Sequence, residues 1–180
     1  DTRLYRVGKR IQIIQADGRR LVFQAPGEGA ATGTVCTSEQ LGQGELTLDG
    51  DGYRWTWPQL RELRFDAAGF LVRIAPVGGS DSESLRITRD SGGLVREVSD
   101  PAGRRMQFDY DASGRLARID HPLGTWHYRI GNEGQLIEVL APDGSARRYA
   151  YDDVGHRTRM TSITDIDGES RQVIGRWAYD

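Results

Sequence analysis

Glycine-centred turn signals recur along this chain about every 20 residues, and this period restricts the possible folds more than any other feature. The clearest copy is Tyr110–Gly114, where an aromatic residue, an aspartate, two variable residues and a glycine follow one another. Segments 65–69 and 151–155 share that form, and 88–92 and 130–134 are weaker copies. The key glycines, Gly93 directly after segment 88–92 and Gly114, Gly134 and Gly155 at the ends of their segments, are spaced by 21, 20 and 21 residues.

Each copy has the chemistry of a tight turn. An aspartate at the first position accepts a backbone N–H bond, and a glycine at the fourth position tolerates positive φ. Between two strands, this arrangement gives a short hairpin loop with a Gly bulge. Pro-x-Gly turns at 100–103, 121–124 and 141–144 lie between the copies, so each period holds two turns and two short strands. We therefore predict an all-β fold, an antiparallel meander of repeated hairpins, with helix disfavoured throughout.

The expected roles of the turn residues follow from this chemistry. Asp111 and Asp152 order their turns, and Gly114, Gly134 and Gly155 take the left-handed conformation. The prolines start the alternate turns, and the tyrosines pack along the sheet. The full set of predicted turn residues is Asp66, Gly69, Pro101, Gly103, Tyr110, Asp111, Gly114, Pro122, Gly124, Gly134, Pro142, Gly144, Tyr151, Asp152 and Gly155.

The segments between the turns are short and imperfectly alternating. Strands are expected at 94–99, 104–110, 116–121, 126–130, 136–140 and 146–151. Leu116 and Ile119 would lie on opposite faces of a regular strand unless a bulge shifts the register. We therefore expect both faces of the sheet to be partly polar, as in a thin wall rather than a sandwich with one dry core.

The first part of the chain also favours hairpins. Asp17-Gly18 separates two apolar runs at 10–15 and 21–23, which is a strong hairpin signal. Residues 25–44 are glycine-rich and predict a long loop, with a weak strand around 35–37. Tyr53, Trp55 and Trp57 alternate and so share one strand face. That face either packs in a core or between strands, or it binds a carbohydrate or protein ligand.

Composition excludes several classes of function. The chain has 180 residues and a net charge of −2, so no global field recruits nucleic acid. Cys36 is alone, which excludes an internal disulfide and favours a buried apolar role. No apolar run is long enough to span a membrane. The chain starts without Met or a signal peptide and stops where the motif would begin again, so we expect a piece of a longer protein.

The sequence offers little chemistry. The histidines are His121, His127 and His156, and neither a serine nucleophile elbow nor a zinc-binding HExxH motif is present. The carboxylate pairs Asp109/Asp111 and Asp152/Asp153 recur in phase with the turns, which indicates turn formation rather than acid–base catalysis. The acidic glycine loops at 49–52 and 165–168 lack the ligands of an EF-hand. We predict no catalytic set, no cofactor and no metal site.

Several motifs resemble those of the bacterial Rhs family, whose members are also called YD-repeat proteins. These motifs are YDxxGRL at 110–116, PDG at 142–144, YAYD at 149–152 and WAYD at 177–180. GRxxxF at 18–23 and GYxW at 52–55 resemble the region that precedes the repeats. By this resemblance, residues 1–60 form the pre-repeat region and residues 61–180 form repeats, cut off within a repeat, in the N-terminal part of the repeat core.

The resemblance implies a structural role in a polymorphic toxin. Rhs proteins wind antiparallel strands into a hollow shell around a C-terminal toxin, and many are delivered from a bacterial cytoplasm to competing cells, often by type VI secretion. Related shells occur in insecticidal toxin complexes and in teneurins. The implied partners are the rest of the shell, its toxin domain, and a secretion spike or chaperone. The chain is too short to close a shell and lacks the family's plug and self-cleavage region. The alternative is a stand-alone binding module that uses Tyr53, Trp55 and Trp57.

Overall fold

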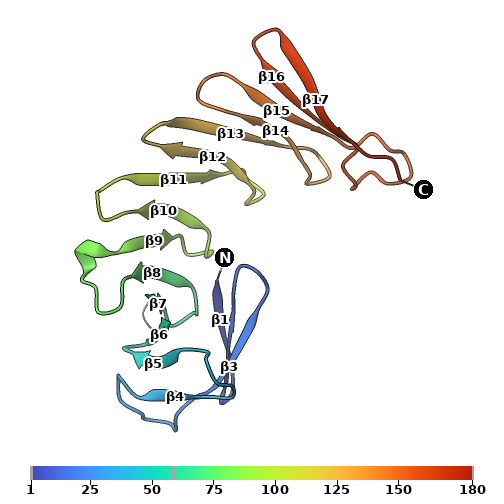
Figure 1. Ribbon diagram of the computed structural model, residues 1–180. Coiled ribbons are helices and arrows are strands. Elements are labelled where there is room, and N and C mark those ends of the chain that lie inside the picture. The colour runs from blue at the N-terminus through green and yellow to red at the C-terminus, as the bar shows by residue number, and fades with distance from the viewer. Residues whose placement is uncertain (1, 58–59, 180) are drawn as a thin grey trace. The chain divides into compact units, whose positions relative to one another are not determined.

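The computed structural model describes residues 2–57 and 60–179, and these residues form β-strands joined by turns (Figure 1). The helical structure in this described part is one 3₁₀ turn, η1 (Asp81–Glu83). The chain divides into two compact units, residues 1–103 and 104–180. The strands of the first unit are β1 (Arg3–Val7), β2 (Arg10–Ile14), β3 (Arg20–Gln24), β4 (Val35–Ser38), β5 (Glu45–Asp49), β6 (Gly52–Trp57), β7 (Arg61–Phe65), β8 (Leu71–Ala75), β9 (Leu85–Arg89) and β10 (Val95–Ser99). Those of the second unit are β11 (Arg105–Tyr110), β12 (Leu116–His121), β13 (Gly124–Ile130), β14 (Leu136–Leu140), β15 (Ala146–Ala150), β16 (Ser162–Asp167) and β17 (Ser170–Arg176).

Strands that follow one another in the chain pair antiparallel within each unit. In the first unit this holds from β1 to β10. In the second unit it holds from β11 to β17. The predicted antiparallel meander of hairpins is therefore confirmed. The strand expected at 126–130 begins earlier, at Gly124, because a two-residue loop lets Gly124 lie opposite His121.

The first unit has a buried hydrophobic core. The sheet of β1–β3 contributes Leu4, Ile11, Ile13, Leu21 and Phe23 to a buried cluster. The later strands complete that cluster with Cys36, Leu46, Tyr53, Trp55, Leu63, Phe65 and Leu71. Burial of each large apolar side chain contributes about 1.5–3 kcal/mol. Cys36 is buried here, as expected, and desolvation raises the pKa of its thiol.

This core includes residues on both sides of residue 60, where the predicted pre-repeat region ends, and the first compact unit extends to residue 103. Leu63 and Phe65 on β7 and Leu71 on β8 pack into the same cluster as Ile11 and Phe23. The first repeat hairpin therefore shares its core with the strands that precede the repeats.

The second unit is built differently. Within the described residues 104–179, no side chain is buried. Phe108, Ile119 and Trp126 lie opposite one another on β11, β12 and β13 and are only partly covered. A single layer of strands with two accessible faces accounts for this pattern, and cross-strand pairs stabilise it. The expectation of partly polar faces, made for the strands at 94–151, is confirmed in this unit.

Candidate functional site

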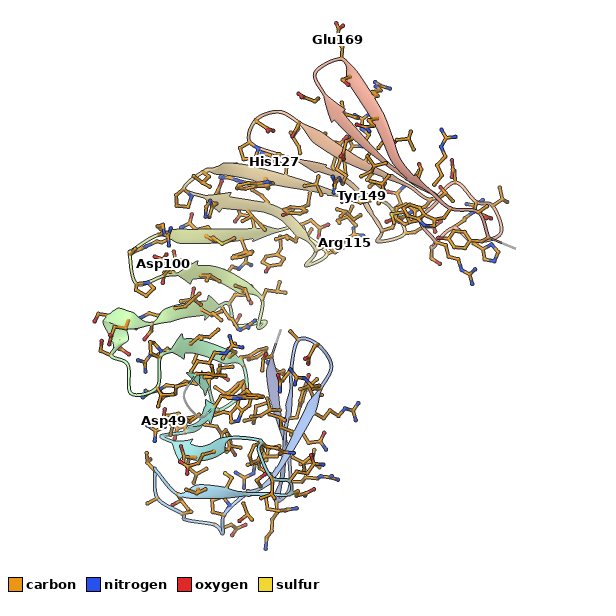
Figure 2. All side chains as sticks on the ribbon, viewed as in Figure 1. Asp49, Asp100, Arg115, His127, Tyr149 and Glu169 are labelled. Carbon is orange, nitrogen blue, oxygen red and sulfur yellow. The ribbon has the colours of Figure 1, made fainter. Side chains whose placement is uncertain are left out.

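The turn at Asp111 shows how each repeat is closed. The backbone N–H of Gly114 donates to the Asp111 carbonyl at 2.9 Å, and that of Asp111 donates to the Arg115 carbonyl at 2.8 Å. Asp111 Oδ1 accepts from the N–H groups of Ser113 and Arg115 at 2.8 and 2.9 Å. Gly114 has a φ of 74°, the left-handed conformation that the turn assignment requires. Arg115, labelled in Figure 2, contacts Asp111 Oδ2 at 3.1 Å through Nε.

These contacts act on the carboxylate. The backbone N–H of Arg115 lowers the pKa of Asp111 most, desolvation raises it, and the N–H of Ser113 and the Arg115 guanidinium lower it further, so that the net shift is downward. Hydrogen bonds and a nearby cation favour the charged form of a carboxyl group. Asp111 is thus held as an anion by its own turn, which suits a structural acceptor rather than a proton donor.

Other copies of the motif build the same turn. Asp66 Oδ1 accepts from the Phe70 N–H at 2.8 Å, and Asp90 Oδ1 accepts from the Leu94 N–H at 3.0 Å. In the copy at 130–134, Gly131 stands where the others have aspartate, yet its N–H still donates to the Gln135 carbonyl at 2.7 Å. The glycine at the fourth position of this turn, Gly134, has a positive φ of 87°. The backbone turn therefore forms without the carboxylate.

A β-bulge follows four of these turns in phase. Tyr110 lies opposite Leu116, but the next pair is Asp109 with Arg118, which leaves one extra residue on β12. The same two-against-one register occurs between β7 and β8, between β9 and β10, and between β13 and β14. The extra residues are Val72, Arg96, Ala117 and Ile137. The bulge puts Leu116 and Ile119 on the same face, which resolves the conflict seen in the sequence.

The alternate turns are more varied. At Asp100, the carboxylate accepts from the Ala102 N–H at 2.9 Å and the carbonyl accepts from the Gly103 N–H at 3.0 Å, around Pro101. At Pro122, His121 Nδ1 accepts from the Leu123 N–H at 3.1 Å.

In the third alternate turn, Ser145 donates to Asp143, and Gly144 has a φ of 86°. A Cβ placed on Gly124 would lie 2.7 Å from Pro142 Cγ. Pro142 therefore packs on the alternate turn before its own, a contact that the sequence analysis did not foresee.

The prediction for Gly155 was wrong. Its φ is not positive, and its N–H donates at 2.8 Å to Asp153 Oδ1, so Asp153 rather than Asp152 closes this turn. Asp152 instead bonds the Thr161 side chain: its carboxylate accepts from the Thr161 hydroxyl, and its own backbone N–H donates to that hydroxyl oxygen at 3.3 Å. The Thr161 hydroxyl lowers the pKa of Asp152. The physical reason is that the chain after Tyr151 runs through a longer loop to β16 instead of returning at once as a hairpin.

The aromatic face of β6 is part of the core. Tyr53 and Trp55 are only 5% and 3% exposed, and Trp57 packs against the same cluster. Trp55 Nε1 donates to the buried carbonyl of Gln43 at 2.7 Å. Packing therefore uses this face, and its two most buried rings are not available to a carbohydrate or protein ligand. Trp55 and Trp57 meet edge to face, with ring centroids 5.2 Å apart.

Ionisable side chains of the described residues make ion pairs and ring contacts. Figure 2 shows His127 on β13, where it is exposed, and His121 contacts Trp126 edge to face at a centroid distance of 5.9 Å. Within residues 2–57 and 60–179, no cluster of three or more His, Cys, Asp or Glu side chains has a metal-binding arrangement. The described part of the chain also contains no helix long and apolar enough to cross a membrane.

Comparison with known proteins supports the repeat assignment. The family model named RHS Repeat matches residues 89–125 and 133–170. The chain is 40% identical over 134 residues to Double-stranded DNA deaminase toxin A of Burkholderia cenocepacia, covering 69% of this chain and 9% of that protein. It is 35% identical over 176 residues to Toxin protein Tse5 of Pseudomonas aeruginosa, covering 92% of this chain and 13% of that protein.

A solved structure, the Tc holotoxin pore of Photorhabdus luminescens, aligns with 90% of this chain and 8% of its own chain, at a TM-score of 0.46 and 12% identity. The chain thus spans about a tenth of the length of the relatives it matches. The turns recur in phase along an antiparallel meander, and the RHS Repeat model matches the same segments of the chain. The structure and the comparisons therefore agree on a repeat protein. The chain belongs to the Rhs, or YD-repeat, family.

Proposed function

We propose that this chain is a length of wall in a hollow β-shell that encloses a toxin carried by the same protein. Its direct role is structural, and it carries out no catalysis of its own. The toxin would be a C-terminal domain, and the remaining repeats of the shell would complete the enclosure. Delivery of the loaded shell from a bacterial cytoplasm to competing cells, by type VI secretion with a spike or chaperone, belongs to the same proposal.

One observation carries the proposal: the described residues 104–179 form a sheet in which no side chain is buried. An ordinary domain buries one face of its sheet against another layer. Here both faces of the sheet stay accessible, and the turns and bulges repeat in phase. Further hairpins with the same turn and bulge could therefore be added to the sheet. Such a sheet separates two spaces, which is the function of a wall.

Ion pairs suit a sheet of this kind because they stabilise it without a dry core. Arg147 contacts Asp165 across β15 and β16 at 2.6 and 2.9 Å. On β14, Glu138 accepts from Arg129 at 3.1 Å and from Arg148 at 2.5 Å, which links three strands. Cross-strand pairs of opposite charge each contribute roughly 0.2–1 kcal/mol.

The relatives support the association with a toxin. Both are named as toxins, and one is named for deamination of double-stranded DNA. This chain matches about a tenth of each, so we assign any toxin activity to another part of the protein.

Limited proteolysis of the protein as its gene encodes it tests the enclosure. The C-terminal region should resist protease in the native full-length protein and be digested when it is expressed alone. A variant that lacks residues 115–134, about one repeat period, should lose the protection. Equal digestion of the C-terminal region in the native full-length protein and in isolation would show that the shell does not enclose it.

A further inference from the structure

In two pairs of neighbouring repeat turns, the residue that follows the glycine of one turn contacts the next turn. Phe70 follows Gly69, and its ring covers Gly93 of the next turn so closely that a Cβ on Gly93 would overlap it. Arg115 follows Gly114, and its Nη1 lies 3.9 Å from the Cβ position of Gly134 in the next turn. The same Nη1 donates to the Gly131 carbonyl at 3.4 Å. In both cases, the residue after one turn glycine covers the next.

The turn at Asp66–Gly69 is covered by a different element. The backbone of β1 lies against it, and the N–H of Leu4 donates to the Gly69 carbonyl at 3.0 Å. A Cβ on Gly69 would overlap the carbonyl oxygen of Leu4 and lie 2.9 Å from its carbonyl carbon. Figure 1 shows β1 beside the turn that leads into β8.

Arg3 strengthens the same contact. It pairs with Phe70 in an isolated antiparallel bridge, and its Nη2 donates to the Ala68 carbonyl at 2.9 Å. Its guanidinium carbon lies 3.2 Å from the centre of the Phe70 ring, an attractive arrangement for a cation and an aromatic face. Arg89 approaches that ring as well, at 4.8 Å. Phe70 thus joins β1 to the following turn at Gly93.

We propose that β1 is a cap for the stack of repeat turns. It occupies the position on Gly69 that a residue from a preceding turn would take, and its backbone leaves no space there for a side chain. Terminal units of repeat proteins need such a cap because their outer face has no neighbouring repeat. Since Leu4 also belongs to the buried cluster, docking of β1 both ends the stack and closes the core of the first unit.

The proposal goes beyond a role as wall, because it assigns β1 and Gly69 a function that the interior turns do not have. It predicts that Gly69 tolerates alanine less well than Gly134, an interior turn glycine with a similar backbone conformation and room at its Cβ position. Gly134 is the matched control, since its φ of 87° is close to the 77° of Gly69 and its Cβ position is 3.9 Å from the nearest atom. The strain of positive φ is therefore common to both, and the overlap with Leu4 belongs to Gly69 alone.

Hydrogen exchange on the full-length protein, read by mass spectrometry, tests the cap. Gly69→Ala should raise exchange in peptides that contain residues 3–7 at least about tenfold, because opening of the docked strand becomes easier. Gly134→Ala should leave those peptides unchanged and raise exchange only around residues 131–137. Equal exchange of residues 3–7 in the two variants would overturn the proposal.

A second measurement does not depend on a destabilised variant. Arg3→Cys combined with Phe70→Cys should form a disulfide on mild oxidation, because residues opposite each other in an antiparallel pair lie within bridging distance. Val7→Cys with Phe70→Cys is the control, since Val7 is at the other end of β1 and should not reach. Failure of the first pair to oxidise, or oxidation of both pairs at one rate, would show that β1 is not docked on this turn.

Discussion

Leu116 lies opposite Tyr110 at the end of the β11–β12 pair, one residue out of step with the pairing of Asp109 and Arg118. The extra residue, Ala117, makes a β-bulge that directly follows the turn of Asp111 and Gly114. Turn and bulge act together: the turn reverses the chain, and the bulge brings Leu116 to the face of Ile119. Stability of this hairpin therefore depends on the backbone conformation of a few residues rather than on a core.

Gly114→Val should destabilise the hairpin by more than about 1 kcal/mol, because a β-branched residue is strained at positive φ. Gly155→Val is the matched control, since Gly155 does not have positive φ and its Cβ position lies 3.4 Å from Asp153 Oδ1, an ordinary contact. Urea denaturation would measure both. A midpoint unchanged by Gly114→Val, or lowered equally by both variants, would contradict the turn assignment.

The stability should also depend on pH through Asp111. Its folded pKa is lowered, so its contribution is complete above the unfolded value of about 3.9 and is lost as pH falls through the folded value. Between about pH 6 and pH 3, the wild type should therefore lose more stability than Asp111→Asn, whose side chain has no charge to lose. Denaturant midpoints at the two pH values would show this, and parallel losses in both proteins would contradict it.

The sequence predicted the repeat much better than the contacts between repeats. Asp111 and Gly114 were correctly placed because a tight turn is specified by the residues within it. Gly155 was misassigned because its fate depends on a loop that closes through Asp153 and Thr161, outside the five-residue motif. The docking of Leu4 on Gly69 has no local signal at all, since the two residues are far apart in the chain.

The sequence left two interpretations of the β6 aromatic face open, packing and ligand binding, and only the fold distinguishes them. Alternation placed Tyr53 and Trp55 on one face, but periodicity cannot show what covers that face. Because the sheet of β1–β3 closes over it, those rings became core residues. In the second unit a similar aromatic residue, Trp126, is only partly covered, since the described residues 104–179 form a single layer of strands.

Trp55→Ala should therefore act on stability rather than on ligand binding. Loss of a buried tryptophan costs about 3–5 kcal/mol, and the Gln43 carbonyl would lose its donor. Trp177→Ala is the control, because Trp177 is 44% exposed and should change the thermal midpoint little. Calorimetry would compare the two variants. A folded, equally stable Trp55→Ala protein that had lost binding on a glycan array would instead support the binding-module interpretation.

Glu138 offers a prediction about the second unit, where ion pairs stabilise the sheet in place of a core. Its side chain is only 14% exposed, whereas its partners Arg129 and Arg148 are 67% and 53% exposed. Glu138→Gln should lower the free energy of unfolding by roughly 0.2–1 kcal/mol for each pair lost, since exposed partners are well solvated. The effect should shrink as ionic strength rises to about 1 M, where charges are screened within about 3 Å.

Asp165→Asn, which breaks one exposed pair with Arg147, should show a smaller change with the same salt dependence. Urea midpoints at low and high salt would measure both, and a loss on Glu138→Gln that does not vary with salt would show that packing, not charge, accounts for its role between β13 and β15.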